Sequence, residues 1–191
     1  MVRSRSFDEA QVLTDAMNAF RQHGFAGVSI KTLEAATGLT SGSIYNAYGD
    51  KDGVYRAALN HYIDAVIRWR LDTYIGAEGG VDGVERLFLS LLSDGEANPN
   101  GCLLTNAAVE FGAGPSVATQ GVQDGLALLE AGMRDALLRD IDAEHVDRAV
   151  TRLLLIYQGI LVLRRAGRDI SASDAVVRDE FDHLRKMRKS C

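Results

Sequence analysis

The chain contains few of the residues that cross-link or interrupt a fold. Its 191 residues include only two cysteines and two prolines. The cysteines, Cys102 and Cys191, lie far apart, so no disulfide framework is predicted and a reducing, cytoplasmic setting is expected. The four histidines show no metal-ligand spacing such as HExxH, so we expect no metal site and no cofactor.

Long hydrophobic runs are also missing. The most apolar stretch, LLLIYQGILVL at 153–163, has about half of the ~20 residues that a membrane-spanning helix needs, and it contains Gln158. The first residues include Arg3, Arg5 and Asp8 and lack the apolar core of a signal peptide. The sequence therefore predicts neither a membrane span nor a secretory signal.

An excess of basic residues is absent as well, because the net charge is -5. Residues 1–55 carry five basic side chains, Arg3, Arg5, Arg21, Lys31 and Lys51, against six acidic ones, Asp8, Glu9, Asp15, Glu34, Asp50 and Asp52. Net charge steers association but does not define a binding site. Any contact with DNA must therefore use hydroxyls, backbone N–H groups, helix N-termini and few cations. We therefore predict that the logarithm of DNA affinity falls only modestly with the logarithm of salt concentration, since each neutralised phosphate contributes about -0.9 to that slope.

Apolar residues recur with the period of an α-helix along almost the whole chain, and no segment sustains a period of two. The pattern predicts an all-α fold of about nine helices without strands. Ser29, Thr40 and Asp50 are the expected N-caps of three N-terminal helices. The expected helices are one that ends at Gly24, then 30–37, 40–47, a longer one that starts at 50 and fades at YIGAEGG, residues 74–80, and then 84–91, 102–111, 117–139, 143–165 and 173–188. The last starts with a capping box formed by Ser171 and Asp174.

A short helix, a glycine-containing turn and a second short helix form a helix-turn-helix pattern at 29–47. In such a unit the second helix lies in the major groove. Ile44 is expected to point inward, and Gly42 allows the backbone to approach DNA closely. The side chains left outside carry hydroxyl and amide groups that suit base edges and phosphates: Ser41, Ser43, Tyr45, Asn46 and Tyr48.

The segment VSIKTLEAATGLTSGSIYNAYGDKDGVYRAAL, residues 28–59, resembles the DNA-binding region of the TetR family of bacterial regulators. Gly38 lies at the turn, SGSIY follows the usual small–Gly–Thr/Ser–apolar–Tyr string, and Tyr48 stands where Phe is usual. Residues 49–51 read Gly-Asp-Lys where Gly-Ser-Lys is common. One departure is Glu34, which replaces a small apolar residue, so packing between the two short helices is expected to differ locally.

The resemblance implies a homodimer with a helix-turn-helix DNA-binding domain at 1–50 and a regulatory, ligand-binding and dimerisation domain at 51–191. Such a protein is a ligand-responsive transcriptional regulator, usually a repressor, which binds a palindromic operator. A small-molecule effector among the central helices would shift the fourth helix and change the spacing of the two DNA-binding heads. The DNA contacts implied are Ser41, Gly42, Ser43, Tyr45, Asn46, Tyr48 and Lys51, with Thr32 and Thr40 as phosphate contacts.

The last two long helices are the dimer interface that the resemblance implies. The 153–163 stretch is apolar around most of its circumference, and Val177, Phe181 and Leu184 give the last helix a matching stripe. Both features favour an isologous dimer. A helix buried within one subunit remains an alternative.

An effector pocket requires an apolar lining with a few polar groups. Asn106 and Glu110, four residues apart on one helix face, are the best polar candidates, and Cys102 at the start of that helix can be a thiol that senses oxidants or electrophiles. Each position also fits ordinary core packing. The candidate lining residues are Tyr62, Trp69, Phe88, Leu92, Cys102, Leu103, Asn106, Glu110, Tyr157 and Leu161.

Two other functional classes are open at this point, a helical-bundle enzyme and a protein-interaction module that has lost DNA binding. The sequence shows no nucleophile with a base partner, no paired catalytic carboxylates and no phosphate loop such as GxxxxGKS, so an enzyme is not expected. The polar face at 41–48 argues against the interaction module.

Overall fold

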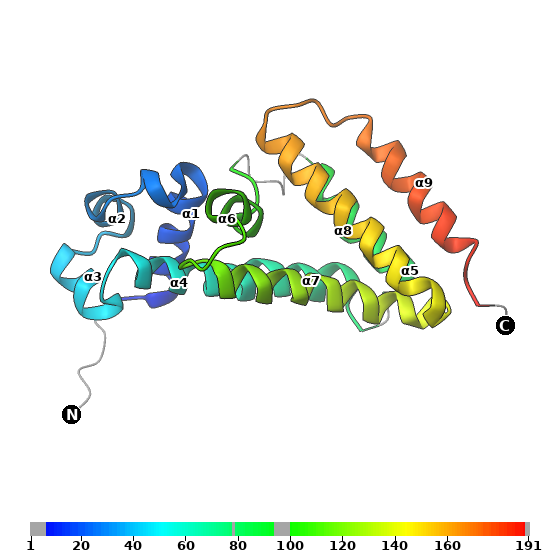
Figure 1. Cartoon of the computed structure of the whole chain (residues 1–191), viewed down its shortest axis with the longest axis horizontal. Coiled ribbons are helices and arrows are strands. Elements are labelled where there is room, and N and C mark those ends of the chain that lie inside the picture. Colours follow the sequence, from blue (N-terminus) through cyan, green and yellow to red (C-terminus); the bar gives the residue numbers. More distant parts are fainter. Residues whose placement is uncertain (1–6, 78, 94–99, 190–191) are drawn as a thin grey trace. The chain divides into compact units, whose positions relative to one another are not determined.

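The computed structural model describes residues 7–77, 79–93 and 100–189, and within them the fold is all-α, with nine α-helices and no strand (Figure 1). The predicted fold class is thus confirmed. The helices are α1 Glu9–Gly27, α2 Ile30–Thr37, α3 Ser41–Tyr48, α4 Lys51–Tyr62, α5 Gly80–Leu92, α6 Leu103–Phe111, α7 Thr119–Asp140, α8 Ala143–Arg165 and α9 Ser173–Arg185. Two π-helical segments, Ile63–Arg68 and Leu71–Ile75, follow α4. Arg3, Arg5, Cys191 and most of the predicted loop at 95–101 lie outside the described residues.

Side-chain caps begin the N-terminal helices as predicted. Ser29 accepts a hydrogen bond from the N–H of Thr32 at 3.1 Å, and Thr40 accepts one from the N–H of Ser43 at 3.2 Å. The Asp50 carboxylate accepts from the Gly53 N–H at 2.7 Å. Each cap satisfies a backbone donor that the first helical turn leaves without a partner.

The start of α9 differs from the prediction. Ser171 and Asp174 do not form a capping box; the N-cap is Ala172, which has no capping side chain. Asp169 instead accepts hydrogen bonds from the N–H and the hydroxyl of Ser171, at 2.8 and 3.0 Å, in an Asx-type turn. Asp174 pairs with Arg178, so neither predicted partner is available for a capping box.

The chain forms two compact units. The first comprises the described residues of Met1–Val66 together with Cys102–Gly125, and the second those of Ile67–Gly101 and Leu126–Cys191. The first unit therefore includes α4 and α6 as well as α1, α2 and α3. The functional division expected at residue 50 stays a prediction.

Aromatic rings form the centre of the first unit. The Tyr55 ring lies 4.8 Å from that of Phe20, 5.1 Å from that of Phe25 and 5.5 Å from that of Phe111, between ring centroids. Burial, with a smaller effect of the nearby Glu110 carboxylate, raises the pKa of Tyr55 well above its usual value. The phenol therefore stays neutral, and the cluster ties α1, α4 and α6 together.

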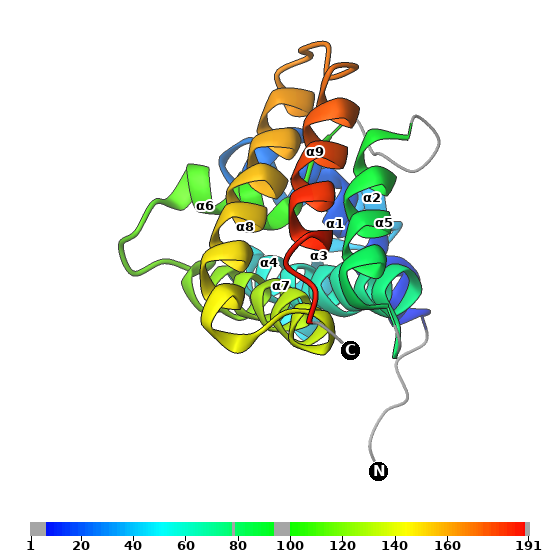
Figure 2. The same ribbon diagram turned by 90° about the vertical axis from the view of Figure 1, so that its right-hand side faces the viewer.

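In the second unit α5, α8 and α9 lie side by side (Figure 2). The fully buried Phe88 of α5 packs against Tyr157 of α8 and Phe181 of α9, at centroid distances of 5.5 and 5.4 Å. Arg185 bridges from α9 to Asp82 and Glu85 on α5. None of the described helices is long and apolar enough to cross a membrane.

Candidate nucleic-acid interface

The helix-turn-helix is built from α2, the turn at Gly38 and α3. Leu33 of α2 and Ile44 of α3 are buried, with exposures of 0% and 2%, and they anchor the two helices to the core of the first unit. Gly38 has φ of 71°, a left-handed conformation that suits glycine, and its N–H bonds to the carbonyl of Glu34. Ile44 is thus the inward anchor that the sequence predicts.

The outer face of α3 carries Gly42, Tyr45 and Asn46, which are spaced i, i+3 and i+4 and are all exposed. Tyr45 is 51% exposed. Within the described residues neither the Tyr45 hydroxyl nor the Asn46 amide is engaged in a hydrogen bond. Both are therefore free to bond to base edges, where an asparagine amide pairs well with adenine.

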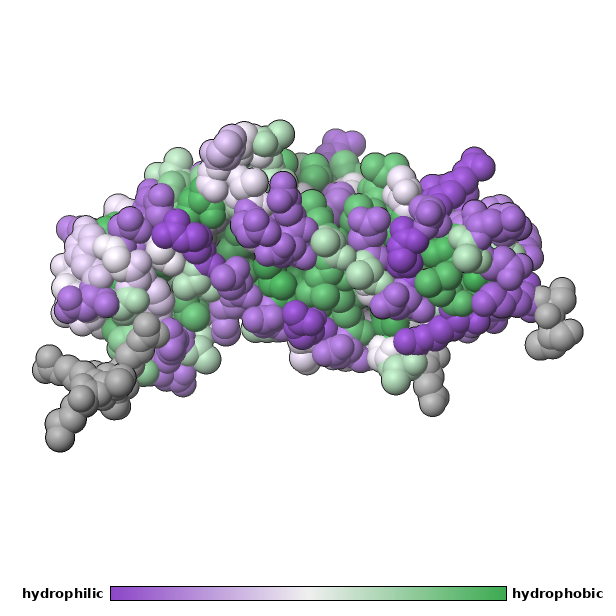
Figure 3. All heavy atoms as spheres, turned by 60° about the horizontal axis from the view of Figure 1, so that its bottom comes forward, coloured by the Kyte–Doolittle hydropathy of each residue, from purple (hydrophilic) through white to green (hydrophobic). Residues whose placement is uncertain are grey.

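Both predicted phosphate contacts, Thr32 and Thr40, also take part in helix capping. The Thr32 hydroxyl accepts a hydrogen bond from the N–H of Ser29, and the Thr40 hydroxyl bonds to both the N–H and the hydroxyl of Ser43. Because a hydroxyl has one donor and two acceptor sites, each keeps capacity for a further bond. The surface over α2 and α3, at the left of Figure 3, is mostly pale, as expected of neutral hydroxyl side chains.

Lys51 has an internal role that the sequence did not reveal. Its ammonium donates to the carbonyls of Phe25 and Val28, at 3.0 and 3.1 Å, and lies 4.0 Å from the centroid of the Phe25 ring. It thereby fixes the segment between α1 and α2. At most one of its three donors remains for a phosphate.

Tyr48 was predicted to point outward with the other polar residues of α3, but its hydroxyl oxygen is buried. Tyr48 lies four residues after Ile44, so the helical repeat places both side chains on the inward face. A DNA contact through the Tyr48 hydroxyl is inconsistent with this position.

Glu34, the departure noted in the sequence, connects α2 to α3. Its Oε1 accepts a hydrogen bond from the backbone N–H of Ser41, the first residue of α3, at 2.6 Å. The N-terminal end of α3 is therefore capped both by Thr40 and by a carboxylate from the neighbouring helix.

Two residues outside the predicted DNA contacts support the helix-turn-helix: Gly53 lies against the end of α3, and Glu110 binds the turn that precedes α2. A Cβ atom at Gly53 would lie 1.8 Å from the backbone oxygen of Tyr48, so the start of α4 is in close contact with the end of α3. Glu110 of α6 accepts from the N–H groups of Phe25 and Ala26, at 2.9 and 2.8 Å. These N–H groups follow Gly24, where φ of 72° breaks α1, so the carboxylate predicted to face a ligand instead caps this turn.

The predicted effector-binding residues divide between the two units. Tyr62, Cys102, Leu103, Asn106 and Glu110 belong to the first, and Trp69, Phe88, Leu92, Tyr157 and Leu161 belong to the second. Cys102 is 3% exposed and Trp69 is 52% exposed. Among the described residues, no group of histidine, cysteine and acidic side chains could hold a metal ion.

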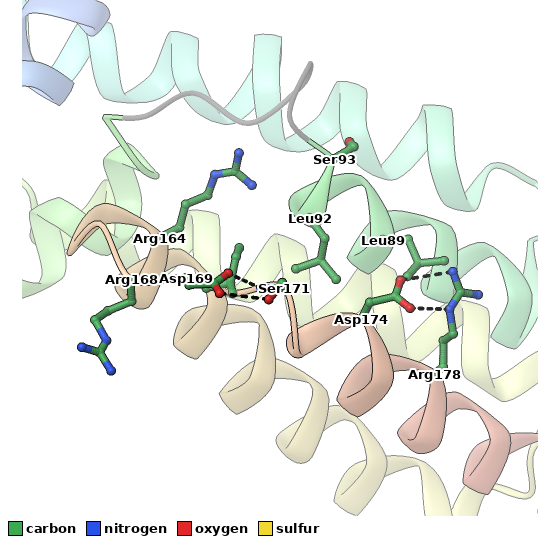
Figure 4. A pocket seen from close by; sticks show the side chains of 10 residues that line it. Leu89, Leu92, Ser93, Arg164, Arg168, Asp169, Ser171, Asp174 and Arg178 are labelled. Atoms are coloured by element: carbon green, nitrogen blue, oxygen red, sulfur yellow. Dashed lines mark hydrogen bonds and ion pairs between the residues drawn. The ribbon is translucent and has the colours of Figure 1, made fainter.

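A cavity of about 670 Å³ lies in the second unit beside the loop between α8 and α9 (Figure 4). Its acidic groups are engaged, since Asp174 forms two hydrogen bonds with Arg178 and Asp169 bonds to Ser171. Arg164 donates to the carbonyl of Leu91. Of the predicted lining, Leu92 contributes to this cavity; the full lining is Leu89, Leu92, Ser93, Arg164, Arg168, Asp169, Ile170, Ser171, Asp174 and Arg178.

Comparison with known proteins gives matches for the helix-turn-helix region and for the whole fold. Residues 12–58 match the family model described as bacterial regulatory proteins, tetR family. The HTH-type transcriptional regulator YezE of Bacillus subtilis is 27% identical over 113 residues, 58% of each chain. The HTH-type transcriptional repressor ComR of Escherichia coli is 39% identical over 62 residues, 32% of this chain and 30% of ComR. The matched segments thus span less than two thirds of either relative.

Solved structures match nearly the whole chain. The TetR family transcriptional regulator CifR, as a cysteine mutant complexed with 26bp double-strand operator DNA, is 26% identical with a TM-score of 0.78, over 94% of this chain and 98% of CifR. A TetR family regulator from Cytophaga hutchinsonii has a TM-score of 0.81 over 98% of this chain and 100% of its own, and at 18% identity it shows the fold alone.

Proposed function

Because the chain belongs to the TetR family of bacterial transcriptional regulators, we propose that it represses transcription by binding a palindromic operator as a homodimer. The observation that carries this proposal is the outer face of α3, where Tyr45 and Asn46 present hydrogen-bonding groups with no internal partner. The similarity to CifR, whose structure contains operator DNA, supports it. The relatives are regulators of transcription rather than enzymes, and we place the protein in the cytoplasm, where bacterial DNA lies.

The homodimer in this proposal uses α8 and α9. Leu155, Val162 and Leu163 on α8 are 70%, 48% and 46% exposed, and Val176 on α9 is 57% exposed. Large apolar side chains gathered on two neighbouring helices are typical of a protein interface. A two-fold axis through this face would pair it with itself and produce an isologous dimer.

Selection of purified protein against a random duplex library tests the proposal. We expect enrichment of an inverted repeat, with half-site centres about one helical turn, ~34 Å, or a multiple of it apart. The protein is first refolded to remove any co-purified ligand and is shown to be folded and dimeric. Such protein must enrich an inverted repeat. If it enriches no sequence, the proposed DNA-binding function is wrong.

The proposed effector binds in the second unit, where the described cavity has the volume typical of small-molecule sites. Leu89, Leu92 and Ile170 provide apolar surface. The lining contains three arginines and two aspartates, so its positive charges outnumber its negative ones. We therefore expect an acid with an apolar body to bind better than the matched alcohol.

Thermal unfolding measures this preference. An acid present at about 100 times its Kd stabilises the folded chain by about 2.7 kcal/mol, which corresponds to an increase in Tm of roughly 5–10 °C for a chain of this size. Replacing Leu92 by glutamate, which adds a negative charge to the lining, should abolish the shift. Equal shifts with acid and alcohol, or an undiminished shift in the variant, would contradict the assignment.

A further inference from the structure

The groups with which the first unit can hold DNA phosphates are few. The Lys51 ammonium is occupied by the carbonyls of Phe25 and Val28. Among residues 7–66, Lys31 and Arg56 are the exposed lysine and arginine side chains without a hydrogen bond or ion pair. Sequence-independent affinity for DNA comes mainly from such cations. The charge of any anion at the DNA-facing surface therefore has a large relative effect.

Glu34 provides such an anion at the N-terminal end of α3. Its carboxylate accepts from the Ser41 N–H at 2.6 Å and is only partly buried. Helix N-termini attract anions because their N–H groups are unpaired and the helix dipole is positive there. In a helix-turn-helix, the N-terminal residues of the second helix face the DNA, and helix N-termini are among the groups that bind phosphates.

We propose that Glu34 is a selectivity residue that disfavours sequence-independent DNA binding. Its carboxylate accepts the hydrogen bond of the Ser41 N–H, which is then unavailable to a DNA phosphate. Its negative charge also repels the DNA backbone. Affinity then depends on contacts of Tyr45 and Asn46 with base edges. A specific binder benefits from such a repulsive element, because specificity is the difference between two affinities. The inference rests on the proposed function.

Glu34→Gln isolates the charge, because the amide oxygen can still accept from the Ser41 N–H. Binding to a nonspecific duplex is measured by fluorescence anisotropy over a series of salt concentrations. At low salt we expect at least about fivefold tighter binding, the size of one unit-charge interaction at the protein–water boundary. The salt slope should steepen by about 0.9 for each head in contact. Binding to the selected operator should tighten less, so the specificity ratio falls.

The matched control is Glu144→Gln on α8, which makes the same change in net charge at a 77% exposed carboxylate of the second unit. It should leave affinity and slope unchanged. If the wild type binds DNA and the Glu34→Gln variant binds the nonspecific duplex with the same or lower affinity, the proposed role of Glu34 is wrong. The proposed function stands in that case. If the wild type binds no duplex at low salt, both are overturned.

Discussion

Replacing Tyr45 by alanine is expected to abolish specific operator binding while the dimer stays folded. The side chain is half exposed on the outer face of α3, and the buried Ile44 continues to anchor the helix. Truncation of an aromatic residue at the centre of an interface costs about 2 kcal/mol or more. Because a dimer loses this contact in both heads, about 4 kcal/mol is lost, which is roughly a 1000-fold decrease in operator affinity.

Titration of the selected operator measures this effect, with circular dichroism and sedimentation to confirm fold and dimer. Val109→Ala is the control, since Val109 is 78% exposed on α6 of the same unit and its loss should not alter affinity. Affinity for a nonspecific duplex should fall much less than that for the operator. Wild-type operator affinity in the Tyr45 variant would exclude the proposed role of α3.

The starts of α2, α3 and α4 could be predicted because their causes are local, whereas the predicted ends of the first and fourth helices differ from the observed ends at Gly27 and Tyr62. The caps at Ser29, Thr40 and Asp50 each join a side chain to an N–H three residues later, so the contact is visible in the sequence itself. The helical repeat likewise identified Ile44 as buried. Applied to Tyr48, four residues further on, the same repeat gives the inward position that the structure has.

The contacts that could not be predicted join distant parts of the chain. Lys51 reaches carbonyls more than twenty residues earlier, at Phe25 and Val28, and Glu110 accepts from N–H groups 84 and 85 residues away. Both residues were interpreted as binding groups because an isolated polar side chain has no visible partner in a sequence. In the structure their partners are backbone groups around Gly24 and the end of α1, which almost any residue type would supply, and their contacts with DNA or an effector stay predictions.

Gly53→Ala is the second change with a large expected effect, on stability and on DNA binding together. Its Cβ atom would lie 1.8 Å from the carbonyl oxygen of Tyr48 and 2.9 Å from the carbonyl carbon. Overpacking of this kind costs about 1–3 kcal/mol, so we expect Tm to decrease by roughly 3–10 °C. Because Tyr48 ends α3, the shift that relieves the clash moves the DNA-binding helix. If each of the two heads loses one base contact worth about 1.4 kcal/mol, operator affinity decreases by about 100-fold.

Gly27→Ala at the end of α1 is the matched control, since the added Cβ would lie 3.5 Å from that of His23, an ordinary contact. Thermal melting and operator titration of both variants give the Tm and the operator affinity. A Gly53→Ala variant with wild-type Tm and affinity would show that α3 and α4 are not in tight contact. The clash involves backbone atoms on one side, so no rotamer of a neighbouring side chain can remove it. Stability and affinity should therefore fall together in Gly53→Ala, whereas Tyr45→Ala, which removes a DNA-contacting group without moving the helix, should lower affinity alone.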